Sequence, residues 1–292
     1  MQASELSRAV AAAVSTASAL GLTVDDAIVL QDSNRVTLRL MPCDVVARVA
    51  PLGLRPSAEI EVELGLQLAR VGSPVAALDP RVEPRVYVHE GFVMNLWTHY
   101  DSLPPQELPP AGYAHALERL HAGMRQLDLT TPHFTDRVAE AQRLVGSREL
   151  SPTLAGPDRA LLADTLSDLG RSISDRGAAA EQLLHGEPHP GNVLGTTATD
   201  LRFIDLETCC RGPVEMDLAY VPEDVSEHYP GADQDLLGEC RALTLAMVAA
   251  WRWDRDDDFP DGRAAGHALL AALRAGPPWP TINSVWRPLD RS

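Results

Sequence analysis

The spacing of apolar residues alternates between a helical and a strand period along the first hundred positions. Residues 4–20 carry apolar side chains three and four positions apart, which predicts an amphipathic helix that ends at Gly21. A second helix is predicted from Pro56 to Arg70. Short runs of strand character lie at 27–30, 35–41, 45–49, 85–88 and 92–97. The pattern predicts a small antiparallel sheet with one inserted helix.

From Pro104 onward the helical period dominates. Helices are predicted at 111–127, 133–147, 157–180, 234–252 and 263–274. A short hairpin is predicted from residues 193–194 and 201–204, and it presents Asp205 at its end. We therefore expect an α+β fold with a strand-rich first part and a larger, mainly helical second part.

The composition argues against several classes of protein. With 292 residues and 45% hydrophobic content, the chain is long enough for one large or two small domains with a substantial core. The formal charge is −16 and the sequence has no basic stripe, so we expect no binding to nucleic acid. An acidic surface instead favours cationic small molecules, although a net negative charge is also a common means of keeping a protein soluble.

The cysteines and the first residues bear on localisation. Four cysteines, Cys43, Cys209, Cys210 and Cys240, have neither metal-site spacing nor the density of a disulfide scaffold. Residues 1–22 contain Arg8 as their one basic residue and many polar ones, unlike a signal peptide or a membrane span. We expect a cytoplasmic protein with no membrane partner.

One stretch carries the strongest chemical signal. It is His185-Gly-Glu-Pro-His-Pro-Gly-Asn192, followed by Phe203-Ile-Asp-Leu-Glu207 and then by Asp217. Phosphoryl transfer depends on Mg²⁺ and on positioning groups, because negative charge spreads over the phosphoryl oxygens in the transition state. Mg²⁺ prefers oxygen ligands, which Asn192 and Asp205 supply. Glu187 is the candidate general base for the acceptor hydroxyl.

These residues resemble the signature of the aminoglycoside phosphotransferase family, relatives of choline kinases and protein kinases, which is H-G-D-x-x-x-x-N, then I-D, then a later D. The resemblance implies a two-lobed protein-kinase-like fold, with a nucleotide-binding lobe over 1–98 and a catalytic and acceptor-binding lobe over 99–292. It implies ATP or GTP as the phosphoryl donor and Mg²⁺ bound by Asn192 and Asp205. It also implies that His185 and Asp217 support the catalytic loop.

The sequence departs from that signature in two ways. Glu187 stands where the family usually has Asp, and a displacement of about 1 Å can cost about 100-fold in rate, so the loop or the substrate must differ too. All 25 basic residues are arginines, so the phosphate-binding lysine of the family is absent. Arg48 is the best substitute, since a guanidinium can hold phosphate oxygens bidentately, and Glu61 is the residue expected to hold it. The alternatives are that Arg48 is a surface arginine of its strand and that Glu61 belongs to a solvated helix face.

The same resemblance places the remaining contacts. Asn95, Leu96 and Trp97 would lie beside the purine, and Asp32-Ser-Asn34-Arg35 would form the turn over the phosphates, although it lacks the glycines of a phosphate-binding loop. The candidate acceptor-binding residues are Glu207, Glu223, Asp224 and Glu227. The acceptor is expected to be a small molecule with a hydroxyl, such as a cationic antibiotic, a sugar or an amino-alcohol. The protein is expected to be a monomer or a homodimer.

Two other functions fit parts of the pattern. An inactive nucleotide- or metabolite-binding protein would explain why Glu187, the absent lysine and a phosphate turn without glycine occur together. A metal hydrolase built on His185, Glu187, His189 and Asp205 would use the alternating His-x-Glu-x-His pattern. The prolines within that pattern argue against the regular strand that such a site requires.

Overall fold

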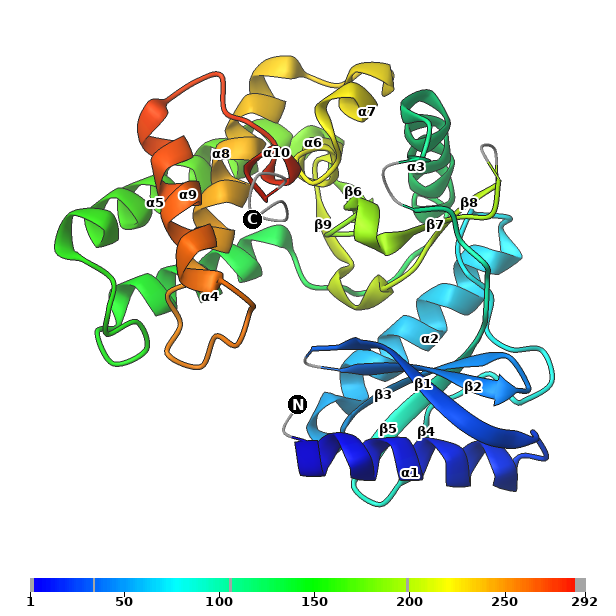
Figure 1. The fold of residues 1–292 in the computed structure, drawn as a ribbon. Coiled ribbons are helices and arrows are strands. Elements are labelled where there is room, and N and C mark those ends of the chain that lie inside the picture. Colours follow the sequence, from blue (N-terminus) through cyan, green and yellow to red (C-terminus); the bar gives the residue numbers. More distant parts are fainter. Residues whose placement is uncertain (1–2, 34, 105–106, 198–199, 287–292) are drawn as a thin grey trace. The chain divides into compact units, whose positions relative to one another are not determined.

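A computed structural model describes residues 3–33, 35–104, 107–197 and 200–286 of the chain (Figure 1). These residues divide into two compact units. The first unit consists of Met1–Pro104 and Leu194–Glu207, and the second consists of Pro105–Val193 and Thr208–Ser292. Each unit is therefore assembled from two separate stretches of the chain.

The first unit is built on an antiparallel sheet. Within the described residues the strand order is β1-β2-β3-β5-β4, with β1 (Val24–Asp32), β2 (Val36–Pro42), β3 (Val45–Pro51), β4 (Tyr87–His89) and β5 (Phe92–Thr98). The helices α1 (Ala3–Ala19) and α2 (Arg55–Arg70) lie on opposite sides of this sheet (Figure 1). A single 3₁₀ turn, η1 (Leu52–Leu54), leads from β3 into α2.

The pleat of β3 separates the core of this unit from its polar side. Val45, Ala47 and Val49 are fully buried among the alanines of α1. Successive strand side chains point to opposite faces, so Arg48 lies on the face that α2 covers and there contacts Glu61. In the ladder between β3 and β5, Arg48 stands opposite Asn95. The alternation thus brings one arginine to a helix that carries glutamates.

A hairpin from later in the chain completes the first unit. Strand β7 (Val193–Gly195) pairs with β8 (Leu201–Phe203). The backbone of Phe203 donates to the Pro74 carbonyl at 2.8 Å and accepts from the Ala76 N–H at 2.9 Å. The Leu103 N–H donates to the Gly195 carbonyl at 2.7 Å. These bonds fix the start of the segment that carries Asp205.

The second unit is mainly helical. Its helices are α3 (Pro110–Met124), α4 (Phe134–Gly146), α5 (Gly156–Gly177), α6 (Val214–Leu218), α7 (Glu223–His228), α8 (Gln234–Trp251), α9 (Gly262–Ala275) and α10 (Ile282–Trp286). Two short strands, β6 (Gln182–Leu184) and β9 (Cys210–Gly212), pair antiparallel. The 3₁₀ turns are η3 (Ala178–Ala180), η4 (Pro190–Asn192) and η5 (Leu206–Thr208), the last of which spans the boundary between the units.

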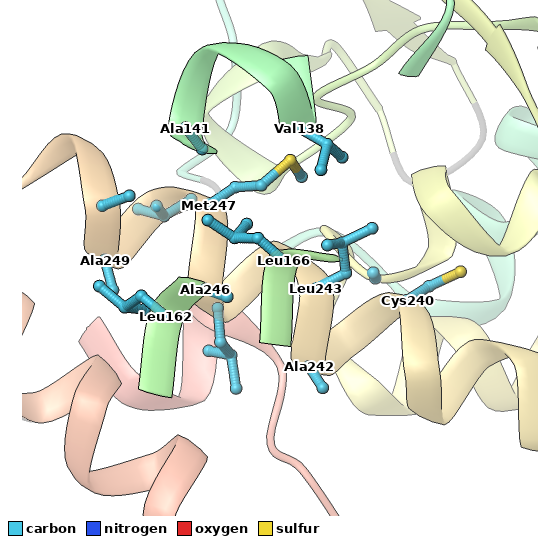
Figure 2. Close-up of a cluster of buried hydrophobic side chains, with 14 of the residues drawn as sticks. Val138, Ala141, Leu162, Leu166, Cys240, Ala242, Leu243, Ala246, Met247 and Ala249 are labelled. Atoms are coloured by element: carbon cyan, nitrogen blue, oxygen red, sulfur yellow. The ribbon is translucent and has the colours of Figure 1, made fainter. Parts of the chain in front are cut away.

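Helix α8 forms the centre of the second core (Figure 2). It is apolar around nearly its whole circumference, which is the pattern of a helix surrounded by other elements. Buried side chains of α4 and α5 pack against it, namely Val138, Ala141, Leu162 and Leu166 against Leu243, Ala246 and Met247 (Figure 2). This core supports the loops that follow β6 and β9.

The sequence-based elements agree with the structure to within a few residues at most ends. The helix expected at 133–147, for example, is α4 at Phe134–Gly146. Several elements of three to six residues, among them β6, β9 and α7, were not predicted, because they are too short to show a period. In the described part of the chain, no helix is both long and apolar enough to span a bilayer.

Candidate functional site

Five charged side chains of the first unit form one cluster, which we call the arginine–carboxylate cluster: Arg35, Arg48, Glu61, Asp205 and Glu207. Arg48 lies at its centre. One guanidinium nitrogen of Arg48 pairs with Glu61, and Nη2 donates to Oδ1 of Asp205 at 2.7 Å. The structure therefore brings together Arg48 and Glu61, the two residues that the sequence placed beside the nucleotide phosphates.

Glu61 differs from its neighbours on α2 by complete burial. Its side chain is 0% exposed, whereas that of Glu59 is 51% exposed and pairs with Arg55 on the surface. Burial raises the pKa of the Glu61 carboxyl, and the guanidinium of Arg48 partly offsets this effect. The helical period turns one glutamate of α2 inward and leaves the other in water.

Arg35 is a second buried cation in the cluster, and sequence reasoning had included it only as the last residue of the turn expected over the phosphates. Its side chain is 5% exposed, and its guanidinium pairs with Glu207 and lies 3.4 Å from Oε2 of Glu61. Burial and then the charge of Asp205 raise the pKa of the Glu207 carboxyl to about 7. Sequence reasoning grouped Glu207 with the acceptor residues, but the structure places its carboxylate in this cluster.

The segment expected to turn over the phosphates, residues 32–35, ends at Arg35. The Ser33 N–H donates to the Arg35 carbonyl at 3.0 Å. Asn34, which the prediction included in this turn, lies outside the described residues. This segment thus contributes positive charge through the Arg35 side chain, rather than through the backbone amides of a glycine-rich loop.

Asp205 follows β8 in an unusual backbone conformation. Its φ is +65°, in the left-handed region that L-residues seldom adopt. Asp205 lies between strand β8 of the hairpin and the turn η5, and these two elements maintain its conformation. The carboxylate of Asp205 is 27% exposed. A partly exposed carboxylate held by a strained backbone is typical of a functional position.

The three residues predicted to contact the purine are engaged in internal contacts. The Asn95 amide donates to Oε2 of Glu61 at 3.0 Å and accepts from the Trp97 indole at 2.7 Å. The Leu96 carbonyl accepts from the Asp79 N–H at 3.0 Å, and the Thr98 N–H donates to the Ala77 carbonyl at 2.9 Å. Asn95 and Trp97 thus orient Glu61 and the helix that carries it.

The motif of the second unit starts where β6 ends, and Asp217 of α6 holds its backbone. Both oxygens of Asp217 accept backbone hydrogen bonds, from the His185 N–H at 2.9 Å and from the Gly186 N–H at 2.8 Å. Nε2 of His121 lies 2.9 Å from Oδ2 of Asp217, and its Nδ1 lies 2.8 Å from the Tyr229 hydroxyl. All these groups except Tyr229 are buried completely or nearly so.

Gly186 makes the sharp turn between β6 and Glu187. Its φ is +91°, and an added Cβ would collide with the Thr208 carbonyl. Only glycine fits both restrictions without strain. The Thr208 hydroxyl also donates to the His185 carbonyl at 3.1 Å, so the segments before and after the hairpin hold each other.

The side chains of Asn192 and Glu187 lie within the same loop. Nδ2 of Asn192 donates to the Glu187 carbonyl at 3.0 Å, which fixes the amide so that its oxygen points away from that carbonyl. In the described residues this oxygen accepts no hydrogen bond, so it is available to a cation. Glu187 is 25% exposed, and its Oε1 pairs with Arg137 of α4.

The acidic residues expected near the acceptor border a cavity of the second unit. Glu223, Asp224 and Glu227 of α7 line a cavity of about 300 Å³ together with Asn283 and Ser284. Arg241 lies 3.4 Å from Glu223, and no described cation pairs with the other two carboxylates. The cavity is therefore acidic.

The residues that could hold Mg²⁺ are few. The described chain contains no group of three or more His, Cys, Asp and Glu side chains arranged to hold a metal, so His185, Glu187 and His189 do not form the metal site of a hydrolase. Taken singly, the amide oxygen of Asn192 in the second unit and the carboxylate of Asp205 in the first are ligands of the kind that Mg²⁺ takes, because this ion binds one or two protein carboxylates and completes its shell with phosphates and water.

The sequence profile of the phosphotransferase enzyme family matches residues 29–256, which is most of the chain. The chain belongs to this family. The resemblance drawn from residues 185–217 is thereby confirmed, and the protein is a phosphotransferase. A comparison with curated proteins gives no match.

Solved structures show that the phosphotransferase has a protein-kinase-like fold. Amicoumacin kinase hAmiN, in complex with AMP-PNP, Ca²⁺ and Ami, is similar with a TM-score of 0.72 and 13% identity over 96% of this chain and 98% of that one. Choline kinase LicA from Streptococcus pneumoniae is similar with a TM-score of 0.67 and 13% identity over 90% of this chain and 98% of that one. The GDP complex of aminoglycoside 2'-phosphotransferase-IIIa is similar with a TM-score of 0.66 and 14% identity over 91% of this chain and 97% of that one. The predicted fold class is confirmed.

Proposed function

We propose that this phosphotransferase transfers the terminal phosphoryl group of ATP or GTP to a hydroxyl of a cationic small molecule. The observation that carries the proposal is the arginine–carboxylate cluster, in which Arg48 contacts both the buried Glu61 and the partly exposed Asp205. A cation held between a helix glutamate and a metal-binding carboxylate is the arrangement that phosphoryl transfer requires beside the nucleotide phosphates.

In this proposal two arginines replace the absent lysine. Arg48 and Arg35 bring two positive charges to a cluster with three carboxylates, and each guanidinium can present a planar pair of donors to phosphate oxygens. When the nucleotide binds, its phosphate oxygens would replace the carboxylates as acceptors of hydrogen bonds from these guanidinium groups. Because the backbone of Leu96 and Thr98 is already bonded internally, we place the purine contact at the residues that follow Thr98.

The loop of the second unit supplies the remaining groups. Glu187 accepts the proton of the acceptor hydroxyl as it attacks the phosphorus, which needs only hydrogen-bond reach and an ionised carboxylate. Asn192 and Asp205 would hold Mg²⁺, which neutralises the charge that develops on the phosphoryl oxygens. Asp217 keeps the loop backbone in place through the His185 and Gly186 amides. His185 contributes through its backbone and through its ring, whose Nδ1 accepts from the Glu187 N–H at 3.4 Å.

The acidic cavity supports a cationic acceptor. Asp224 and Glu227 face it without an arginine partner in the described residues, and the formal charge of the chain is −16. An ammonium group on an antibiotic, an amino sugar or an amino-alcohol would be attracted there. Among the similar structures, one is an amicoumacin kinase, one an aminoglycoside phosphotransferase and one a choline kinase.

A second function is a protein that binds nucleotide without turnover. It is favoured by the ion pairs that join Arg48 to Asp205 and Arg35 to Glu207, because a nucleotide must displace them before a metal can bind. The amide oxygen of Asn192, which accepts no hydrogen bond in the described residues, argues for catalysis. Turnover separates the two functions.

The test is a screen for ADP or GDP release with Mg²⁺ over aminoglycosides, other basic antibiotics, amino sugars and small amino-alcohols. We expect at least one cationic acceptor to accelerate release, and Asp205→Ala to abolish it. Asp200→Ala, on the same hairpin with an exposed side chain, should leave it unchanged. Release that no acceptor accelerates, with tight nucleotide binding, would favour the binding protein, and full activity of Asp205→Ala would contradict the metal site.

A further inference from the structure

An arginine far from the motif in sequence holds the candidate base. Arg137, in the first turn of α4, pairs through Nη2 with Oε1 of Glu187. Its Nη1 donates to the Gly186 carbonyl at 3.3 Å, and its guanidinium lies over the Trp251 ring, 4.9 Å from the ring centroid. Three different kinds of contact therefore fix one guanidinium beside one carboxylate.

The start of α4 is itself anchored to the strands that position the loop. His133 caps α4 by accepting from the Thr135 N–H, and its N–H donates to Asp136. Nε2 of His133 lies 3.0 Å from the Glu181 carboxylate, directly before β6. The Arg211 N–H of β9 donates to the Pro132 carbonyl at 2.8 Å. Strands β6 and β9 pair with each other, so Arg137 and Glu187 extend from one common scaffold.

The contact divides the Glu187 carboxylate into two differently engaged oxygens. Oε1 of Glu187 accepts from Arg137, whereas Oε2 of Glu187 accepts no hydrogen bond in the described residues. Side-chain exposure is 20% for Arg137 and 25% for Glu187, so the pair is neither sealed in the core nor free in water. One oxygen is thus fixed and the other remains available to a proton donor.

We propose that Arg137 is a positioning residue for phosphoryl transfer, which fixes Oε1 of Glu187 so that Oε2 meets the acceptor hydroxyl. This inference rests on the proposed function. It accounts for glutamate at position 187, because an aspartate is shorter by about one carbon–carbon bond and would withdraw from a guanidinium that α4 and Trp251 hold in place. Arg137 and Glu187 act as one unit.

The first experiment measures turnover of an accepted substrate by Arg137→Met, Glu187→Asp and the double variant. We expect Arg137→Met to lower kcat about 100-fold, the cost of a displacement of about 1 Å, with KM for nucleotide and acceptor within about two-fold. Glu187→Asp should lower kcat in the parent protein but add little in Arg137→Met, because both changes remove the same contact. Arg137→Lys should recover part of kcat, since charge returns without the planar fork.

Matched variants separate position from general damage. Arg143, on the same helix and exposed, forms no ion pair in the described residues, so Arg143→Met should retain the parent kcat. A folded Arg137→Met protein with the parent kcat would overturn the proposal. Losses that simply multiply in the double variant would also overturn it, because Arg137 would then act independently of Glu187.

A second measurement needs no turnover and distinguishes this inference from the proposed function. Thermal unfolding of Arg137→Met, Glu187→Gln and their double variant reports whether the two side chains are coupled. We expect the double variant to lose less Tm than the two single losses combined. If the parent protein phosphorylates no acceptor, the proposed function fails, and a coupled Tm still supports the fixing of Glu187 by Arg137. Additive Tm losses would overturn that contact.

Discussion

Asp217 offers the sharpest test of how the loop is held. Replacing it with Ala removes a buried carboxylate that accepts from His185 N–H at 2.9 Å, from Gly186 N–H at 2.8 Å and from the His121 ring at 2.9 Å. An unpaired buried donor costs about 1–3 kcal/mol, and removal of one partner of a buried pair costs about 3–5 kcal/mol. We expect Asp217→Ala to lose about 3–5 kcal/mol of unfolding free energy.

Asp217→Asn separates shape from charge. The amide keeps one acceptor oxygen and turns its NH₂ group toward the second backbone donor, so we expect a loss of about 2–3 kcal/mol. Glu215→Gln is the matched control. Glu215 lies on the same helix, is also buried, and accepts one N–H, from Asp233 at 2.9 Å, which an amide oxygen still accepts. Its loss should stay below about 1 kcal/mol.

The assay is urea unfolding followed by circular dichroism, combined with amide hydrogen exchange of the peptide that contains His185 and Gly186. In Asp217→Asn these amides should exchange faster, while amides of α8 at the core should change only with global stability. Unfolding free energies within about 0.5 kcal/mol of the parent, with unchanged exchange at His185 and Gly186, would refute the bracing role. A loss of unfolding free energy in Asp217→Asn that equals the loss in Glu215→Gln would refute this role as well.

Two further predictions concern the arginines and the turn. Arg35→Met and Arg48→Met should each weaken ATP binding about 10- to 100-fold by calorimetry, because hydrogen bonds to charged groups are worth about 1.5–3 kcal/mol. Arg39 pairs with an exposed carboxylate, so Arg39→Met should change the affinity for ATP less than about two-fold. Equal affinities in all three variants would contradict the binding of the phosphates by Arg35 and Arg48. Gly186→Ala should lower unfolding free energy by more than about 2 kcal/mol, because strain at φ +91° adds to a backbone collision, while Gly231→Ala, at φ +76° in open space, should cost about 1 kcal/mol. Similar costs for both would show that the collision relaxes.

The sequence was most informative where one residue type repeats with a period or where a motif fixes its own spacing. Helix α4 was predicted to within one residue at each end, because its apolar stripe is regular. Arg48 and Glu61 were paired in advance, because the family resemblance implies a glutamate of the inserted helix beside the phosphate-binding cation. The structure shows that strand alternation and helix period do turn these two side chains toward each other.

Contacts set by distant parts of the chain could not be predicted in this way. Arg137 is separated from Glu187 by fifty residues, and at its place on α4 it has the pattern of a surface arginine. Arg35 looks like the polar start of a strand, and only the fold buries it against Glu207. The engaged backbone of Leu96 and Thr98 depends on residues 77–79, which have no period of their own.

The position of the β7–β8 hairpin has a consequence for how the protein is made. The hairpin fills backbone partners of Pro74, Ala76 and Leu103, yet it is synthesised about 100 residues after the rest of its unit. At about 5–20 residues per second, about 5–20 seconds pass on the ribosome before the hairpin can reach those partners. The backbone groups of Pro74, Ala76 and Leu103 must therefore do without the hairpin until about half of the second unit has been synthesised.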